Sequence, residues 1–150
     1  MNQNKRQTVL IVEDQPDLRS LLLDTMERLG GYNVIGAEDG LVGLEAAIEH
    51  RPDCVIVDVL MPQLDGFQFV QAMRGDPDTA SIPLIILTAL AQEVNQFRGL
   101  AYGADKYITK PARPVELVKA IREVLAISEE QRIAQSHAMA ERELPRPHYD

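Results

Sequence analysis

The sequence predicts a doubly wound α/β fold, in which helices cover both faces of a five-stranded parallel sheet. Short apolar runs alternate along the chain with longer stretches of helical periodicity, the pattern typical of βαβ units. Four of the five apolar runs are rich in Val and Ile, as expected of parallel strands that are buried on both faces. Glycine or proline follows each of the first four helical stretches, where helices commonly stop. These three observations indicate five repeats of a strand followed by a helix.

The strands are predicted from the apolar runs, in chain order, at residues 8–12, 33–36, 53–57, 82–87 and 106–108. The run at 33–36 has the weakest strand pattern. Helices are predicted between and after them at residues 17–29, 40–49, 66–74, 92–102 and 114–127.

Two of these helices show an apolar stripe that should face the sheet. In the first helix the stripe comprises Leu18, Leu21, Leu22 and Met26. The last helix begins with Pro114 and carries a stripe of Leu117, Val118, Ile121, Val124 and Leu125. Both stripes predict helices packed on a common core.

Residues 128–150 lie outside the strand-helix pattern and contain no further strand. Ser128 and the residues that follow it match a capping box, so a helix is predicted to about Leu144, before Pro145 and Pro147. We therefore expect one domain over residues 1–127 and a helical tail or linker over residues 128–150.

Composition excludes several classes of protein. The 150 residues suit one domain, and no stretch approaches the roughly 18 consecutive apolar residues of a membrane span. A formal net charge of −8 argues against a general nucleic-acid binder and against binding to an anionic membrane surface. The single cysteine, Cys54, lies in an apolar run and is interpreted as a buried core residue. With no signal-peptide pattern at the N-terminus, the expected location is the cytoplasm.

Polar residues follow four of the predicted strands. Glu13 and Asp14 follow the first strand, Asp58 the third, Thr88 the fourth and Lys110 the fifth. In an open parallel sheet the carboxyl ends of the strands meet at one edge, so these side chains should converge there. Neighbouring carboxylates repel one another unless a cation is present, and oxygen ligands of this kind suit Mg²⁺. The sequence thus predicts a magnesium site.

A magnesium site of this kind, with added donors, suits phosphoryl transfer to a carboxylate. The cation neutralises part of the negative charge on the phosphoryl oxygens, and positioned hydrogen-bond donors stabilise the remaining negative charge. Thr88 and Lys110 are the candidate donors.

Two nearby acids are predicted to cap or begin helices and not to belong to the site. Asp65 precedes a helix as its N-cap, with Gln68 at the third position, and Asp17 caps or begins the first helix.

At these positions the chain resembles the receiver domain of bacterial two-component response regulators, over about residues 8–127. Four motifs carry the resemblance, in the order in which the family shows them: V-L-I-V-E-D, D-V-L-M-P-Q-L-D-G, Thr88-Ala89 and Lys110-Pro111. This family includes chemotaxis regulators, and the resemblance to it implies a flavodoxin-like strand order 2-1-3-4-5. It also implies a signalling protein, not an enzyme, that accepts a phosphoryl group from a sensor histidine kinase or a phosphotransfer protein.

The resemblance also implies a role for each site residue. Asp58 would be the phosphoacceptor and a metal ligand, Asp14 a direct metal ligand and Glu13 a ligand through water. Leu60 would contribute its backbone carbonyl to the metal. Together with Mg²⁺ these residues would form the metal centre.

The remaining roles concern the phosphoryl group and the switch. Lys110 would contact the phosphoryl group or the acceptor carboxylate, and Thr88 would donate a hydrogen bond to a phosphoryl oxygen. Tyr107 would change rotamer together with Thr88 and alter the face made by the fourth helix, fifth strand and last helix. Pro111 is expected to follow a cis peptide bond, which would turn Lys110 over the site.

Two other functions are weighed against this one. An aspartate-nucleophile phosphohydrolase uses similar groups, but it places a second acid two residues after the nucleophile, where this chain has Leu60, and it needs a cap over the substrate. A degenerate receiver would act only as a binding module, yet every chemical position is filled here. The output partner is unknown, a homodimer stays open, and no effector motif follows residue 127. Lys106 and Ala112 depart from the residues that DNA-binding relatives commonly carry.

Overall fold

A five-stranded parallel sheet forms the centre of the molecule. The computed structural model describes residues 6–58, 64–88 and 103–127, with Thr88 by its backbone alone. The strands are β1 (Thr8–Val12), β2 (Asn33–Ala37), β3 (Cys54–Asp58), β4 (Leu84–Thr88) and β5 (Lys106–Thr109). Their order is β2-β1-β3-β4-β5, and all neighbouring pairs are parallel. The predicted fold class and strand order are confirmed.

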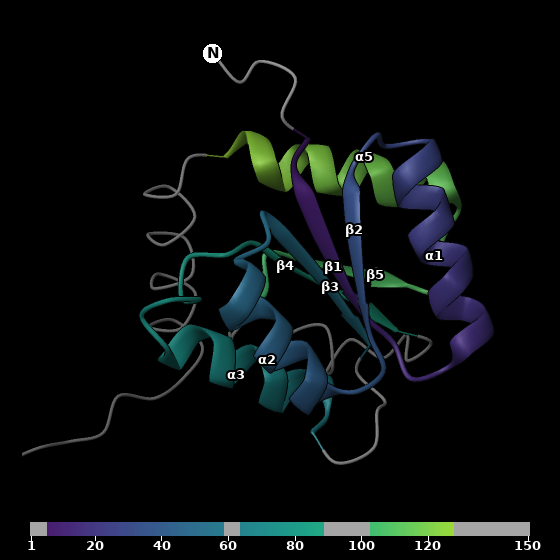
Figure 1. Ribbon diagram of the computed structural model, residues 1–150. Helices are drawn as coiled ribbons and strands as arrows, with labels where there is room; N and C mark the ends of the chain where they lie inside the picture. Colours follow the sequence, from purple (N-terminus) through teal and green to yellow (C-terminus); the bar gives the residue numbers. More distant parts are fainter. Residues whose placement is uncertain (1–5, 59–63, 89–102, 128–150) are drawn as a thin grey trace, which may run out of the picture.

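The helices lie in two layers, one on each face of the sheet (Figure 1). The described helices are α1 (Pro16–Arg28), α2 (Gly40–His50), α3 (Gly66–Gly75) and α5 (Pro114–Ala126). The layer of α1 and α5 covers one face, and the layer of α2 and α3 covers the other. The helices predicted at 92–102 and in the tail 128–150 lie outside the described residues. No helix of the described ranges is long and apolar enough to span a membrane.

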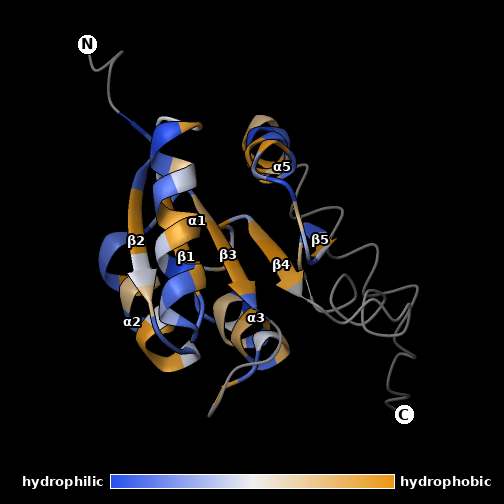
Figure 2. Cartoon of the chain, turned by 90° about the vertical axis from the view of Figure 1, so that its right-hand side faces the viewer, coloured by the Kyte–Doolittle hydropathy of each residue, from blue (hydrophilic) through white to orange (hydrophobic). Residues whose placement is uncertain are grey.

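Two separate apolar clusters form the core, because successive side chains of a strand point to opposite faces. One cluster joins Val9, Ile11, Cys54, Ile56, Ile85 and Leu87 to α1 and α5. The other joins Leu10, Val12, Val55, Val57, Leu84 and Ile86 to α2 and α3. Figure 2 shows the consequence in colour, with β3 and β4 hydrophobic and α1 divided between hydrophilic and hydrophobic residues. Burial of Cys54 agrees with its interpretation as a core residue.

One predicted core position in α1 is wrong. Leu22 and Met26 are buried and Leu18 packs against the same cluster, but Leu21 is 60% exposed. The inward stripe of α1 follows a spacing of four residues from Leu18, and the successive 100° rotations of a helix turn Leu21 away from it. The stripe predicted for α5 is confirmed, with Leu125 at its partly buried edge.

The predicted ends of several elements shift by one or two residues. The fourth strand begins at Leu84 instead of residue 82, because the Ile82 amide donates to Thr79 O at 3.1 Å in a turn. Asp65 caps α3 as predicted, and its carboxylate accepts from the Gln68 amide while the Gln68 side chain accepts from the Asp65 amide. Asp17 lies in the first turn of α1, whose N-cap is Gln15.

Candidate functional site

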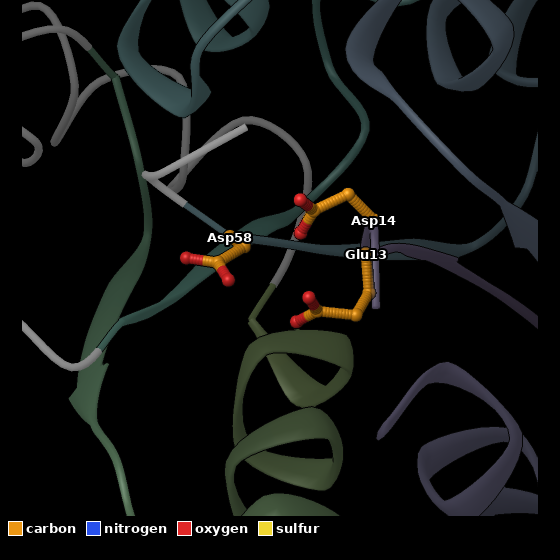
Figure 3. A group of neighbouring side chains, drawn as sticks. All are labelled: Glu13, Asp14 and Asp58. Carbon is orange, nitrogen blue, oxygen red and sulfur yellow. The ribbon is translucent and has the colours of Figure 1, made fainter. Parts of the chain in front are cut away.

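Three carboxylates meet at the carboxyl edge of the sheet. Glu13 and Asp14 directly follow β1, and Asp58 ends the neighbouring strand β3, where Val12 pairs with Val57. One carboxylate oxygen from each of Glu13, Asp14 and Asp58 lies within 4.8 Å of the others. Figure 3 shows the Glu13 and Asp14 side chains extending toward Asp58. The structure thus brings together the three acids that the sequence predicts.

The cluster is largely shielded from solvent. Glu13 is 2% exposed and Asp58 is 7% exposed, while Asp14 is partly exposed. Water screens buried charges weakly, so the repulsion among these carboxylates is stronger than it would be on the surface. Burial first, and then the charge of Asp58, raise the pKa of Glu13 from 4.5 to about 7. A positively charged neighbour would therefore stabilise the cluster.

Lys110 supplies that positive charge. Its Nζ atom donates to Asp58 Oδ2 at 2.8 Å and to Glu13 Oε1 at 3.3 Å. Burial disfavours the charged ammonium, but the hydrogen bond to Asp58 and the charges of both acids outweigh it and raise the pKa of Lys110. The Lys110–Pro111 peptide bond is cis, as expected. Lys110 is therefore a charged bridge between β1 and β3.

Glu13 is held by hydrogen bonds through its backbone and its side chain. Its amide donates to Ala37 O at 3.0 Å, which extends the pairing of β1 with β2 by one residue. Its Oε2 atom accepts from the Gln15 amide at 3.2 Å, and its carbonyl accepts from Arg19 Nη1 at 2.7 Å. The contact with Arg19 was not predicted from the sequence, although Gly36, the last residue of a predicted strand, indicated a close approach by another segment there.

Three further predicted site residues are placed less completely. Thr88 ends β4, one residue beyond the partner of Asp58, but its side chain lies outside the described part of the chain. Leu60 also lies outside the described residues. Tyr107, on β5, packs against the cluster of α2 and α3, and burial followed by the charge of Asp58 raises its pKa. The electrostatic influence of Asp58 thus reaches the expected switch residue.

The donor set fits a hard divalent cation. All three acids offer oxygen, and carboxylate oxygen is the ligand that Mg²⁺ prefers in proteins. The partly exposed Asp14 lies at the solvent side of the cluster, so a hydrated ion has access to it. The arrangement can hold a cation beside a carboxylate that already contacts an ammonium group.

Comparison with known proteins shows the family of the chain. The family model described as the response regulator receiver domain matches residues 9–122, and the chain belongs to this family. The chain is 38% identical over 117 residues to the DNA-binding dual master transcriptional regulator RpaA of Synechocystis sp., covering 78% of this chain and 48% of that protein. It is 39% identical to protein PilH of Pseudomonas aeruginosa, covering 79% of this chain and 97% of PilH.

The fold of the chain is also similar to the folds of solved structures. Chemotaxis protein CheY4 of Vibrio cholerae is 33% identical with a TM-score of 0.75, covering 80% of this chain and 99% of that one. A response regulator from Chloroflexus aurantiacus is 35% identical with a TM-score of 0.76, covering 82% of this chain and all of that one. The chain spans about half the length of most of the curated relatives it matches, which are transcriptional regulators, and nearly the full length of PilH.

Proposed function

We propose that this chain is a two-component switch that accepts a phosphoryl group on Asp58 from a phosphohistidine of a sensor kinase or phosphotransfer protein. One observation carries the proposal: in a chain of the receiver family, the Lys110 ammonium contacts Asp58 inside a cluster of three carboxylates at the carboxyl edge of the sheet.

Asp58 would act as the nucleophile, because its carboxylate ends β3 at the carboxyl edge of the sheet and contacts the Lys110 ammonium at 2.8 Å. The Glu13 carboxylate accepts hydrogen bonds from Lys110 and from the Gln15 amide. In the proposed step a carboxylate oxygen of Asp58 attacks phosphorus, the bond from phosphorus to the imidazole nitrogen breaks, and the nitrogen keeps the electron pair. The product is an acyl phosphate on Asp58.

Glu13, Asp14 and Asp58 would hold Mg²⁺, with the backbone carbonyl of Leu60 as a further ligand. The ion supplies positive charge against the phosphoryl oxygens. Lys110 would have a different role. Its ammonium contacts the Asp58 carboxylate before transfer, and it can stabilise the negative charge of the phosphoryl oxygens after transfer. Thr88 would donate a hydrogen bond to one of these oxygens.

Phosphorylation would be communicated through β5. A phosphoryl group adds roughly −1.5 to −2 charges at Asp58, whose charge, after burial, already raises the pKa of Tyr107. Tyr107 would change rotamer with Thr88 and alter the surface formed by α5 and β5. The output is then a protein partner, a second copy of this chain or a further domain, in line with relatives that include both full-length transcriptional regulators and PilH.

The test is phosphorylation by acetyl phosphate, a small donor, with and without Mg²⁺, followed by intact-mass analysis. We expect the mass of one added phosphoryl group with Mg²⁺ present and none without it. Asp58→Asn should stay unmodified, and Asp14→Asn should need a higher Mg²⁺ concentration. Asp78→Asn is the matched control, because Asp78 is an exposed acid paired with Arg51 away from the site. Labelling of Asp58→Asn to the extent of the unaltered chain would contradict the proposal.

A further inference from the structure

Arg19 connects α1 to the backbone of the acidic cluster. This half-buried arginine is the fourth residue of α1, and its Nη1 atom donates to the Glu13 carbonyl at 2.7 Å. A hydrogen bond from a charged donor is short and about twice as strong as a neutral one. The contact reaches back across the loop that carries Asp14 and Gln15.

The neighbouring strand leaves room for the stem of Arg19. Gly36 of β2 pairs with Ile11 of β1, next to the last pair of the two strands. A Cβ atom on Gly36 would lie 3.4 Å from Arg19 Cδ and 2.9 Å from Leu23 Cδ1. Glycine weakens the interior of a strand, so its presence is explained by the close approach of these two side chains of α1.

The contact controls more than one residue, because the Glu13 carbonyl belongs to the planar peptide unit that continues into Asp14. The Glu13 amide is fixed by Ala37 O at 3.0 Å, and the Glu13 carbonyl is fixed by Arg19. The backbone of Glu13 is therefore held from β2 on one side and from α1 on the other. The directions in which the Glu13 and Asp14 side chains leave the backbone depend on both anchors.

We propose that Arg19 is a positioning residue for the metal site, which sets the directions of the Glu13 and Asp14 carboxylates without touching the ion or the phosphoryl group. The inference rests on the proposed function, since it concerns the same Mg²⁺. Residues that support metal ligands typically contribute 10- to 100-fold to metal affinity. A single carbonyl contact at the cluster should lie at the lower end, about 10-fold.

The test compares Mg²⁺ affinity in three variants of the unphosphorylated protein, measured by titration of amide NMR shifts. Arg19→Met keeps an apolar stem and removes the donor, and Arg19→Lys keeps the charge and a donor. Arg28→Met removes the same charge from the same helix, where Arg28 pairs with Asp24 in solvent. We expect the dissociation constant to rise about 10-fold for Arg19→Met, to recover in part for Arg19→Lys and to stay unchanged for Arg28→Met.

Two further readouts separate positioning from general damage to the fold. In the metal-free protein, amide exchange at residues 13–15 should become faster in Arg19→Met, while the amides of β3 keep their protection. With acetyl phosphate, the phosphorylation rate of Arg19→Met should approach that of the unaltered chain once Mg²⁺ is saturating.

Each outcome decides something different. Unchanged Mg²⁺ affinity in Arg19→Met, or an equal loss in Arg28→Met, would overturn the positioning role and leave the proposed function intact. Failure of the unaltered chain to bind Mg²⁺ would overturn both proposals, whereas Mg²⁺ binding without phosphorylation would overturn the proposed function alone.

Discussion

Replacing Arg74 by methionine should destabilise the domain far more than removing any surface arginine. The Arg74 guanidinium, 16% exposed at the end of α3, donates to the carbonyls of Ala80, Ile82 and Gly103 at 2.6 to 2.9 Å. It also donates to Asp105 Oδ2 at 3.0 Å. Asp105 is 7% exposed and accepts from the Leu84 amide at 2.8 Å, at the start of β4.

The loss of folding stability expected for Arg74→Met follows from the burial of this ion pair. Removing one partner of a buried ion pair typically costs about 3–5 kcal/mol, because the other charge stays in a poorly solvated place. Arg74→Met leaves the Asp105 carboxylate in that position and also deprives three carbonyls of a charged donor. By contrast, Arg28→Met breaks a pair with Asp24 whose side chains are 78% and 53% exposed, and should cost about 0.5 kcal/mol or less.

Urea denaturation of the metal-free protein measures both values. The midpoint should fall strongly for Arg74→Met with the slope of the transition unchanged, since the surface exposed on unfolding stays similar. High salt should leave the difference nearly intact, because a buried pair is screened weakly. The reasoning would be refuted if Arg74→Met and Arg28→Met lost similar amounts of stability.

Two further predictions concern the acidic cluster and the lifetime of the phosphorylated state. Because the pKa of Glu13 is raised from 4.5 to about 7, the unfolded chain releases this proton at lower pH than the folded one. The free energy of unfolding of the metal-free protein should therefore fall as pH rises through this window. Glu13→Gln should flatten that slope in urea denaturation, and an unaltered slope would count against the shifted pKa. The phosphoaspartate should be long-lived, since Leu60 and Leu90, which lie outside the described residues, stand two residues beyond Asp58 and Thr88 and cannot orient water. Replacing them by Asn and Glu should shorten the lifetime of the phosphoprotein in a decay assay; an equal or longer lifetime would refute this.

The fold and the acidic part of the site could be predicted because they depend on local pattern. Strands buried on both faces leave runs of Val and Ile, and the ends of parallel strands must meet at one edge. Placing Glu13, Asp14, Asp58 and Lys110 together needed only the position of each residue after its strand. The cis bond before Pro111 followed from the resemblance to the family.

Other features depend on contacts between distant segments and leave little trace in the sequence. Arg74 looks like an ordinary basic residue in the last turn of a helix, and its carbonyl partners lie up to 29 residues away. The exposure of Leu21 depends on the rotation of α1 about its axis, which is set by packing on β1 and β2. The contact between Arg19 and Glu13 shows only indirectly, through Gly36.

The two apolar clusters on opposite faces of the sheet have a consequence for how such a chain can change. The described members of one cluster do not appear in the other, and the sheet separates most of the two layers. Substitutions in the apolar cluster of α1 and α5 should therefore disturb the packing of α2 and α3 very little. A chimera that takes residues 40–50 and 66–75, together with the strand side chains that face them, from a relative should fold with the other layer unaltered.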